Sequence, residues 1–196
     1  MANAPAGVND FVYPGAIEQR ENDAIEEAIQ SANRGGISNP IARDILPEID
    51  LDAGEDLDAA TWDDDPQWIQ FAPETDPQPA GDYEIYEIDS DTGKMDDRVM
   101  AIYGFEVVEG GEYVNVVRFR GSDGQIFERA HIQGLNEAGD TEVDRQSTLR
   151  SPVLFDAQDN GTVEFEVEEI PDDEEVRVKL LGVTAEKLGR RVGTRQ

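Results

Sequence analysis

The sequence predicts an all-β protein, built as an antiparallel β-sandwich or jelly-roll barrel with an N-terminal helix and an extended arm. From residue 81 onward, short runs of alternating apolar residues recur. Turn signals separate these runs about every 8–12 residues, a spacing typical of sandwiches and barrels. Helical spacing of apolar residues occurs before them, near the N-terminus. No apolar run suits a transmembrane helix or a secretory signal, so no membrane insertion is expected.

The clearest strands lie in one stretch, from Val99 to Ile132. Apolar residues alternate from Val99 to Val107, which is the period of a half-buried strand. Two more apolar runs follow, Tyr113 to Phe119 and Ile126 to Ile132, and a glycine-containing reversal precedes each of them. The stretch is therefore predicted to be a meander of three consecutive strands.

Further strands are expected on both sides of the meander. Tyr83 to Ile88 indicates a short strand before it. After it, residues 133–150 are predicted to form a polar connection, and Pro152 to Phe155 a short edge strand, since proline is tolerated at sheet edges.

The last predicted strands form a hairpin. Thr162 to Glu168 alternates valine or phenylalanine with glutamate, and Val176 to Leu180 alternates apolar residues with Arg177 and Lys179. The outward faces are complementary in charge, so Glu–Arg and Glu–Lys pairs are expected across the hairpin. Such pairs support register more than stability, because each is worth a few tenths of a kcal/mol.

The chain is predicted to divide into three parts. Residues 1–80 form a helix and a proline-rich acidic arm, residues 81–183 the antiparallel β-domain, and residues 184–196 a basic C-terminal tail. The helix is expected from Ala16 to Asn33, and Gly35-Gly36 supplies its stop. Residues 37–80 show no sustained period of 2 or 3.6 and are interpreted as an extended arm.

Aromatic residues in the arm are candidate assembly contacts. Trp62, Trp68 and Phe71 lie between acidic and proline-rich runs, where they would serve as anchors that pack on this chain's own sheet or on a neighbouring subunit. The sequence leaves both choices open. Arg190 and Arg191 of the basic tail complete the predicted contact set, because a cationic strip on an acidic protein can bind an acidic neighbour.

Charge is the strongest global feature. The chain has 45 Asp and Glu against 16 Lys and Arg, a formal net charge of −29, and no cysteine. Folding such a chain at low salt is opposed by repulsion among its carboxylates. Molar salt reduces this repulsion, because the screening length falls to about 3 Å. A partly disordered acidic protein is the alternative, which the predicted strands oppose in the second half. Binding of nucleic acid is disfavoured except through the basic tail, because phosphates are also anionic.

Catalytic and metal-binding patterns are not recognisable, so no catalytic residue, cofactor or metal site is predicted. The single histidine, His131, is interpreted as an ordinary strand residue. The acidic loops at Asp50–Asp58 and Asp89–Gly93 do not fit a calcium loop, and solvated loops are favoured over weak cation sites. Asn160-Gly161-Thr162 matches a glycosylation pattern but is favoured as a turn.

The layout and the acidic, lysine-poor composition resemble virion structural proteins of haloarchaeal viruses. Single jelly-roll capsid proteins of icosahedral, membrane-containing viruses are the nearest comparison, and decoration and tail proteins of tailed viruses are similar in style. The resemblance implies a virion location, symmetric self-association, contacts with other virion proteins and no catalysis. The alternatives are a cell-surface or carbohydrate-binding β-sandwich module of a halophilic archaeon, located at the cell surface or in the cytoplasm, and, ranked last, an enzyme that acts through carboxylates.

Overall fold

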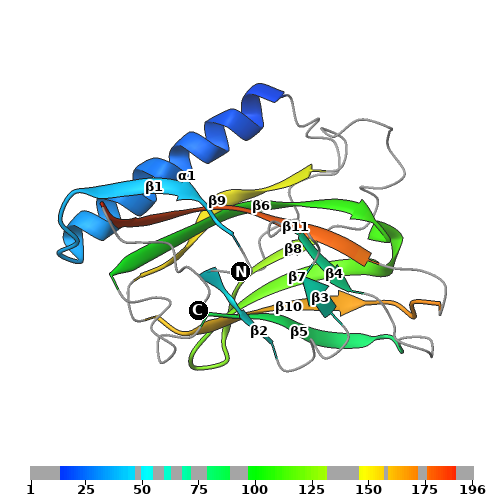
Figure 1. The fold of residues 1–196 in the computed structure, drawn as a ribbon. Helices are drawn as coiled ribbons and strands as arrows, with labels where there is room; N and C mark the ends of the chain where they lie inside the picture. Colours follow the sequence, from blue (N-terminus) through cyan, green and yellow to red (C-terminus); the bar gives the residue numbers. More distant parts are fainter. Residues whose placement is uncertain are drawn as a thin grey trace.

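The computed structural model describes residues 14–46, 50–54, 60–62, 68–71, 79–88, 97–131, 146–156, 159–171 and 176–188. These residues form two antiparallel sheets and one N-terminal helix (Figure 1), as the sequence predicted at this level. The helix is α1 (Pro14–Arg34). The strands are β1 (Pro40–Asp44), β2 (Asp52–Ala53), β3 (Ala60–Trp62), β4 (Trp68–Phe71), β5 (Gly81–Ile88), β6 (Arg98–Glu109), β7 (Val114–Gly121), β8 (Ile126–His131), β9 (Gln146–Phe155), β10 (Gly161–Val167) and β11 (Val176–Lys187).

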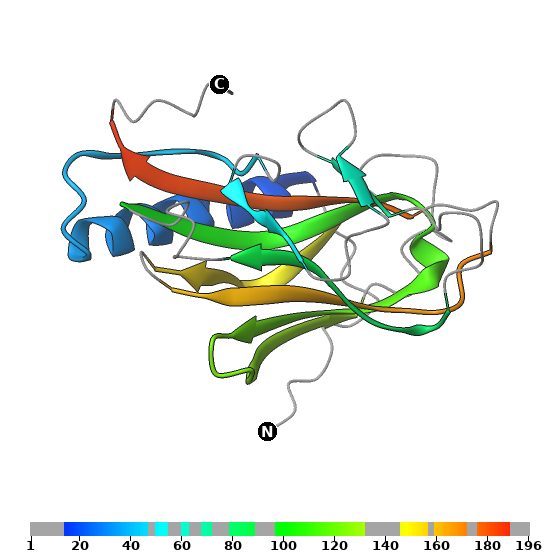
Figure 2. The ribbon, with the colours of Figure 1, turned by 60° about the horizontal axis from the view of Figure 1, so that its bottom comes forward.

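The two sheets lie as two layers over a shared core (Figure 2). Sheet A has the strand order β3-β4-β11-β6-β9, with β1 also paired to β11, and sheet B has the order β2-β5-β10-β7-β8. Their facing side chains form one apolar cluster, in which the rings of Phe105 in β6 and Phe119 in β7 stack with centroids 6.0 Å apart. Burial of these large side chains is the main favourable contribution to the fold.

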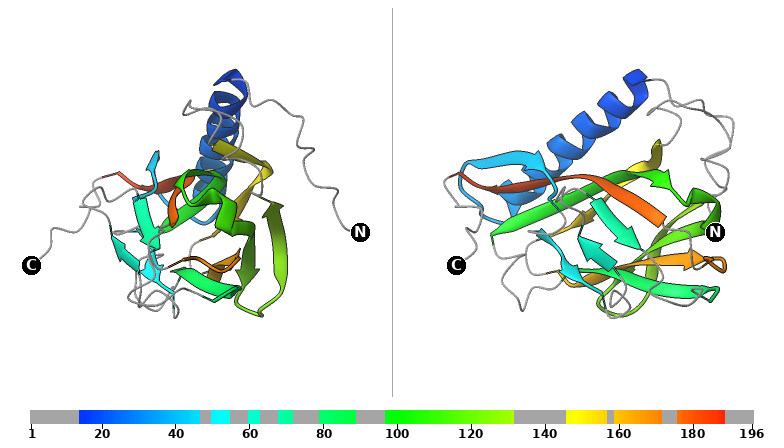
Figure 3. Two further views of the ribbon diagram at one scale, coloured as in Figure 1. Left: turned by 90° about the vertical axis from the view of Figure 1, so that its right-hand side faces the viewer. Right: turned by 45° about the vertical axis from the view of Figure 1, so that its right-hand side comes forward.

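Helix α1 covers the outer face of sheet A, on the side opposite sheet B (Figure 3). Ala24, Ala28 and Ala32 recur every fourth residue and are fully buried, because small side chains let the helix approach the sheet closely. They pack against outward residues of β6 and β11, among them Tyr103 and Val183. Both strands are therefore buried on two faces.

The predicted helix stop at Gly35-Gly36 is confirmed. Gly36 adopts a φ of 86°, which glycine reaches without strain. The amide of Ile37 donates to the carbonyl of Ala32 at 2.9 Å, and the amide of Gly36 donates to that of Asn33 at 3.2 Å, which is the Schellman pattern. Ile37 is buried and belongs with Ala32 to the apolar cluster between α1 and sheet A, so the loop after the helix begins inside that cluster.

The predicted meander is wrong at its first connection. β6 lies in sheet A and β7 in sheet B, so the chain changes layers between them. Gly110, with a φ of 67°, and the short 3-10 helix Gly111–Tyr113 provide this reversal. β7 and β8 do form a hairpin, across a turn in which Gly124 has a φ of 73°.

The predicted hairpin of β10 and β11 is also wrong, because these strands lie in different sheets. β11 carries apolar side chains on both faces, Leu181 and Val183 toward the helix and Leu180 toward the core. Such a strand suits a central position in the covered sheet A, since one face of sheet B has no described element packed on it. The glutamates of β10 instead pair with arginines of β7.

β9 confirms the predicted edge strand, since it ends the order of sheet A and contains Pro152. It begins at Gln146, however, so part of the region predicted as a polar connection is strand. The register between β9 and β6 shifts, because Ile102 pairs with Val153 whereas Gly104 pairs with Thr148. This irregularity accommodates the extra residues of β9 that precede Val153.

The described residues of the predicted arm do not form an extended arm. β1 pairs with the end of β11, from Pro40↔Lys187 to Asp44↔Val183, and β4 pairs with its beginning. Sequence periodicity missed these strands because they have only two to five residues and their partners lie far along the chain. The predicted division at residue 81 stays a prediction.

Candidate functional site: a buried arginine–carboxylate network

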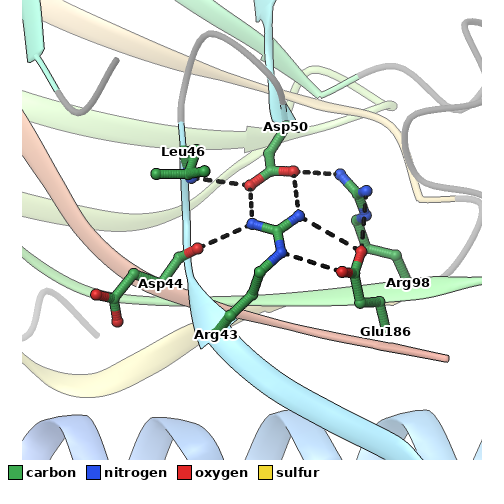
Figure 4. A network of polar contacts seen from close by, with 6 residues as sticks. All are labelled: Arg43, Asp44, Leu46, Asp50, Arg98 and Glu186. Carbon is green, nitrogen blue, oxygen red and sulfur yellow. Dashed lines mark hydrogen bonds and ion pairs between the residues drawn. The ribbon is translucent and has the colours of Figure 1, made fainter. Parts of the chain in front are cut away.

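Four charged side chains meet near one end of sheet A (Figure 4). Arg43 lies on β1, Glu186 on β11 and Arg98 at the start of β6, and these three strands are neighbours. Direct pairing of Glu186 with Arg98 and of Thr184 with Arg43 places all three side chains on the core side. Asp50 comes from the segment that leads from β1 to β2, from one sheet to the other.

Asp50 is the centre of this network. Its Oδ2 accepts from Arg43 Nη1 at 2.7 Å and from the amide of Leu46 at 2.8 Å. Its Oδ1 accepts from Arg43 Nη2 at 2.8 Å and from Arg98 Nη1 at 2.5 Å. The Asp50 side chain has no exposed surface. Two guanidinium groups and one backbone amide therefore surround a single carboxylate.

Glu186 closes the network from the opposite side. Its Oε1 accepts from Arg43 Nε at 3.1 Å, and its Oε2 accepts from Arg98 Nη2 at 3.1 Å. Arg43 Nη1 also donates to the carbonyl of Asp44 at 2.9 Å, within its own strand. Arg98 and Glu186 are buried, with 5% and 4% of their side chains exposed. Arg43 thus bridges both carboxylates and remains partly open to solvent.

The network balances its charges internally, with two guanidinium groups against two carboxylates. Burial alone would lower the pKa of Arg43, but hydrogen bonds and Coulomb attraction from Asp50 and Glu186 outweigh it and raise that pKa. Loss of one partner from a buried pair leaves an uncompensated charge, which is strongly destabilising. Each carboxylate already accepts hydrogen bonds from both arginines. The arrangement is therefore better suited to a structural role than to binding a substrate.

Two further buried polar groups are hydroxyls, one in sheet B and one beside the network, opposite Arg43. Within the described residues, Tyr86 Oη and Thr184 Oγ1 are buried without a hydrogen-bond partner. Burial raises the pKa of Tyr86. A buried hydroxyl that makes no hydrogen bond costs stability. These groups are therefore targets for stabilising substitutions.

A second set of charges crosses the outer face of sheet B. Arg118 of β7 pairs with Asp82 of β5 at 2.5 Å and with Glu166 of β10, and Arg120 pairs with Glu164. The pairing is partly open to solvent, since 56% of the Asp82 side chain is exposed. Exposed pairs of this kind contribute little to stability and are screened by salt.

The predicted aromatic contacts fall on two strands of sheet A. Trp62 lies on β3, and Trp68 and Phe71 lie on β4. Their backbones pair within this chain, Trp62 with Ile69 and Trp68 with Lys179. Their side chains lie outside the described residues, so the choice between an internal and an intermolecular contact stays open.

Some of the other candidate residues lie outside the described part of the chain, and others lie within it. Arg190, Arg191 and the acidic loop after Ile88 lie outside the described part of the chain, as does the side chain of His131. Asn160 is half-buried and directly precedes β10. Asp50 corrects the prediction of a solvated acidic loop, because the side chain is buried against two arginines.

The sequence did not predict that these four charged residues form one network. Arg98 and Glu186 do carry a signal, because each is a charged residue at the end of a strongly apolar strand. Arg43 and Asp50 carry none, since each resembles its charged neighbours in the sequence. The network becomes visible only after the pairing of β1 with β11 is known.

Among the residues that the structure places, no group of three or more histidine and carboxylate side chains has the arrangement of a metal site. No helix in this part of the chain is long and apolar enough to cross a bilayer. Comparison of the sequence with protein-family models gave no match. A search of curated proteins also gave no match.

Proposed function

We propose that this protein is a virion structural protein of a haloarchaeal virus, with a jelly-roll domain that assembles with further copies and with other virion proteins. The strand order is the observation that carries the proposal. Jelly rolls are widespread in capsid proteins. The role proposed is that of an assembling subunit without catalysis.

The strand order supports a jelly roll when β4 to β11 are taken as one folded ribbon. Antiparallel pairs join the strands from the ends inward: β4 with β11, β5 with β10, β6 with β9 and β7 with β8. Two more antiparallel pairs, β11 with β6 and β10 with β7, divide the ribbon between two sheets. A ribbon rolled in this way gives two Greek keys, which is the definition of the jelly roll.

The distribution of charge supports the halophilic part of the proposal. The chain carries a formal charge of −29, whereas the buried network balances its own charges. The carboxylates that account for the net negative charge are therefore expected at the surface. Their mutual repulsion falls in molar salt, where the screening length is about 3 Å.

Mass spectrometry of virions purified from a haloarchaeal host tests the proposal. A structural protein is expected in purified particles in a fixed ratio to the other structural proteins, and it should persist through density-gradient purification. Recovery from the cell envelope or cytoplasm, with none in particles, would contradict the virion role.

A carbohydrate-binding module is the second candidate, since jelly rolls also occur in lectins. The outer face of sheet B favours it, because no described element packs on this face and the partly exposed carboxylates of Asp82 and Glu166 lie on it. Binding to a glycan panel in high salt would support this candidate. An Arg129→Ala variant, which alters an exposed residue of β8, should then weaken the binding.

A further inference from the structure

The sheet edges differ in how well they are protected against pairing with another chain. β9 contains Pro152 and an irregular register, and β8 carries Glu128 and Arg129. β2 and β3 have two and three residues, too few to serve as a template. All of these are devices that discourage edge pairing. β1 is a further edge strand, and although it begins with Pro40, its outward edge has no strand partner among the described residues.

The hydrogen bonds of β1 show which of its backbone groups face outward. The amide of Ile45 donates to the carbonyl of Gly182, and the amide of Leu188 donates to the carbonyl of Asn39. Hydrogen-bonded positions alternate along an antiparallel pair, so the odd-numbered residues of β1 bond to β11. Pro40, Ala42 and Asp44 therefore direct their backbone groups away from β11.

We propose that the outward edge of β1 pairs antiparallel with β1 of a second copy, about a twofold axis at Ala42. Ala42 would then exchange two backbone hydrogen bonds with Ala42 of the second copy. The amide of Asp44 would donate to the carbonyl of Pro40 across the axis, and the reciprocal bond would form in the other half. This pairing deepens the proposed assembly role and rests on it for the choice of a second copy as partner.

Pro40 makes this register self-consistent. Proline has no amide hydrogen, so an ordinary antiparallel pairing would leave the opposing Asp44 carbonyl without a donor. Here that carbonyl already accepts from Arg43 Nη1 of its own chain, at 2.9 Å. The Pro40 nitrogen, which has no hydrogen, would face the Asp44 carbonyl, which already accepts a hydrogen bond. No backbone group at the contact is therefore left without a hydrogen bond.

Side chains at this edge support the same partner. Ile41 and Leu188 are the exposed large hydrophobic residues in the described part of the chain, with 41% and 64% of their surface accessible. Both lie on the core side of sheet A, at neighbouring positions of β1 and β11. Pairing of two copies would cover part of this apolar surface.

Charges at the edge are also complementary. Lys187 lies directly opposite Pro40 in the β1–β11 pair, and both Lys187 and Asp44 are exposed. In the proposed register, Asp44 of the second copy takes the place opposite Pro40 on its other side. The long Lys187 side chain would extend over the proline ring toward that carboxylate. The two Asp44 residues lie about 13 Å apart along the paired strands, so their repulsion is screened.

Sedimentation equilibrium of the full chain in concentrated potassium chloride, combined with hydrogen exchange, tests this pairing. The full chain is expected to be a dimer, or a larger assembly that contains this dimer, and the Ala42 and Asp44 amides should become protected as protein concentration rises. Ala42→Pro removes a donor that faces away from β11, so the fold should tolerate it. Loss of two bonds across the axis should weaken dimerisation at least about tenfold, while Ala42→Ser, which keeps the donor, should not.

A charge exchange provides a second test that does not depend on proline. At the lowest salt concentration at which the chain stays folded, where exposed charges are least screened, Asp44→Lys and Lys187→Glu should each weaken association, and the double variant should restore it. A monomer at all concentrations, an Ala42→Pro variant that associates as the natural chain does, or additive charge variants would each overturn the proposed pairing. Detection in purified virions is a separate measurement. The virion role and the pairing of β1 can therefore be contradicted independently of each other.

Discussion

Replacement of Asp50 by asparagine should show how strongly the buried network stabilises the fold. Asp50→Asn keeps the side-chain shape but removes a charge that two arginines and the Leu46 amide share. It also turns an amide NH₂ toward groups that are themselves donors. Breaking a buried pair in this way costs about 3–5 kcal/mol of unfolding free energy. For a chain of this size the loss corresponds to a fall in Tm of about 6–20 °C.

Asp82→Asn is the matched control. Asp50 and Asp82 each accept from an arginine at 2.5 Å, but the Asp50 side chain is fully buried whereas 56% of the Asp82 side chain is exposed. The exposed pair should contribute at most about 1 kcal/mol, and less as salt increases. Chemical unfolding of both variants at several salt concentrations measures the difference.

Equal losses in the two variants, or a loss at Asp50 that disappears in high salt, would refute this reasoning. An Arg43→Gln, Asp50→Asn double variant removes one charge of each sign. It should recover part of the stability that Asp50→Asn loses, because the remaining Arg98 and Glu186 still balance each other.

Three further predictions concern the interior and the charge. Tyr86→Phe should raise the free energy of unfolding by about 1 kcal/mol, because the buried Tyr86 hydroxyl has no hydrogen-bond partner among the described residues; denaturant unfolding would contradict this by showing a loss. Burial, with Glu21 and Asp44 nearby, raises the pKa of Tyr103 to about 12. Its neutral form is therefore favoured in the fold, and stability should fall as pH rises from about 10 to 12. The fall should be smaller in Tyr103→Phe, and melting curves across this pH range measure it. Finally, Tm should rise between about 0.1 M and 3 M potassium chloride, and equal melting in both would contradict the halophilic interpretation.

The sequence by itself determined the local features of this protein. Alternation of apolar residues identified β10, since a strand with one buried face carries that period in its own residues, and apolar runs next to turn signals identified β5 and β7. The helix and its glycine stop were likewise visible, because a Schellman turn depends on residues within one short segment. The formal net charge of −29 followed directly from composition.

Tertiary structure alone decided which strands became neighbours and which charges became buried. β10 and β11 follow each other in sequence but lie in different layers, because helix α1 covers sheet A and a strand that is apolar on both faces is best buried there. Asp50 resembles every other acid of its run until β1 pairs with β11 and brings Arg43, Arg98 and Glu186 around it. Burial and partnership are properties of residues brought together from distant parts of the chain, so the local sequence marks Arg98 and Glu186 as charges in apolar strands but does not encode their partners.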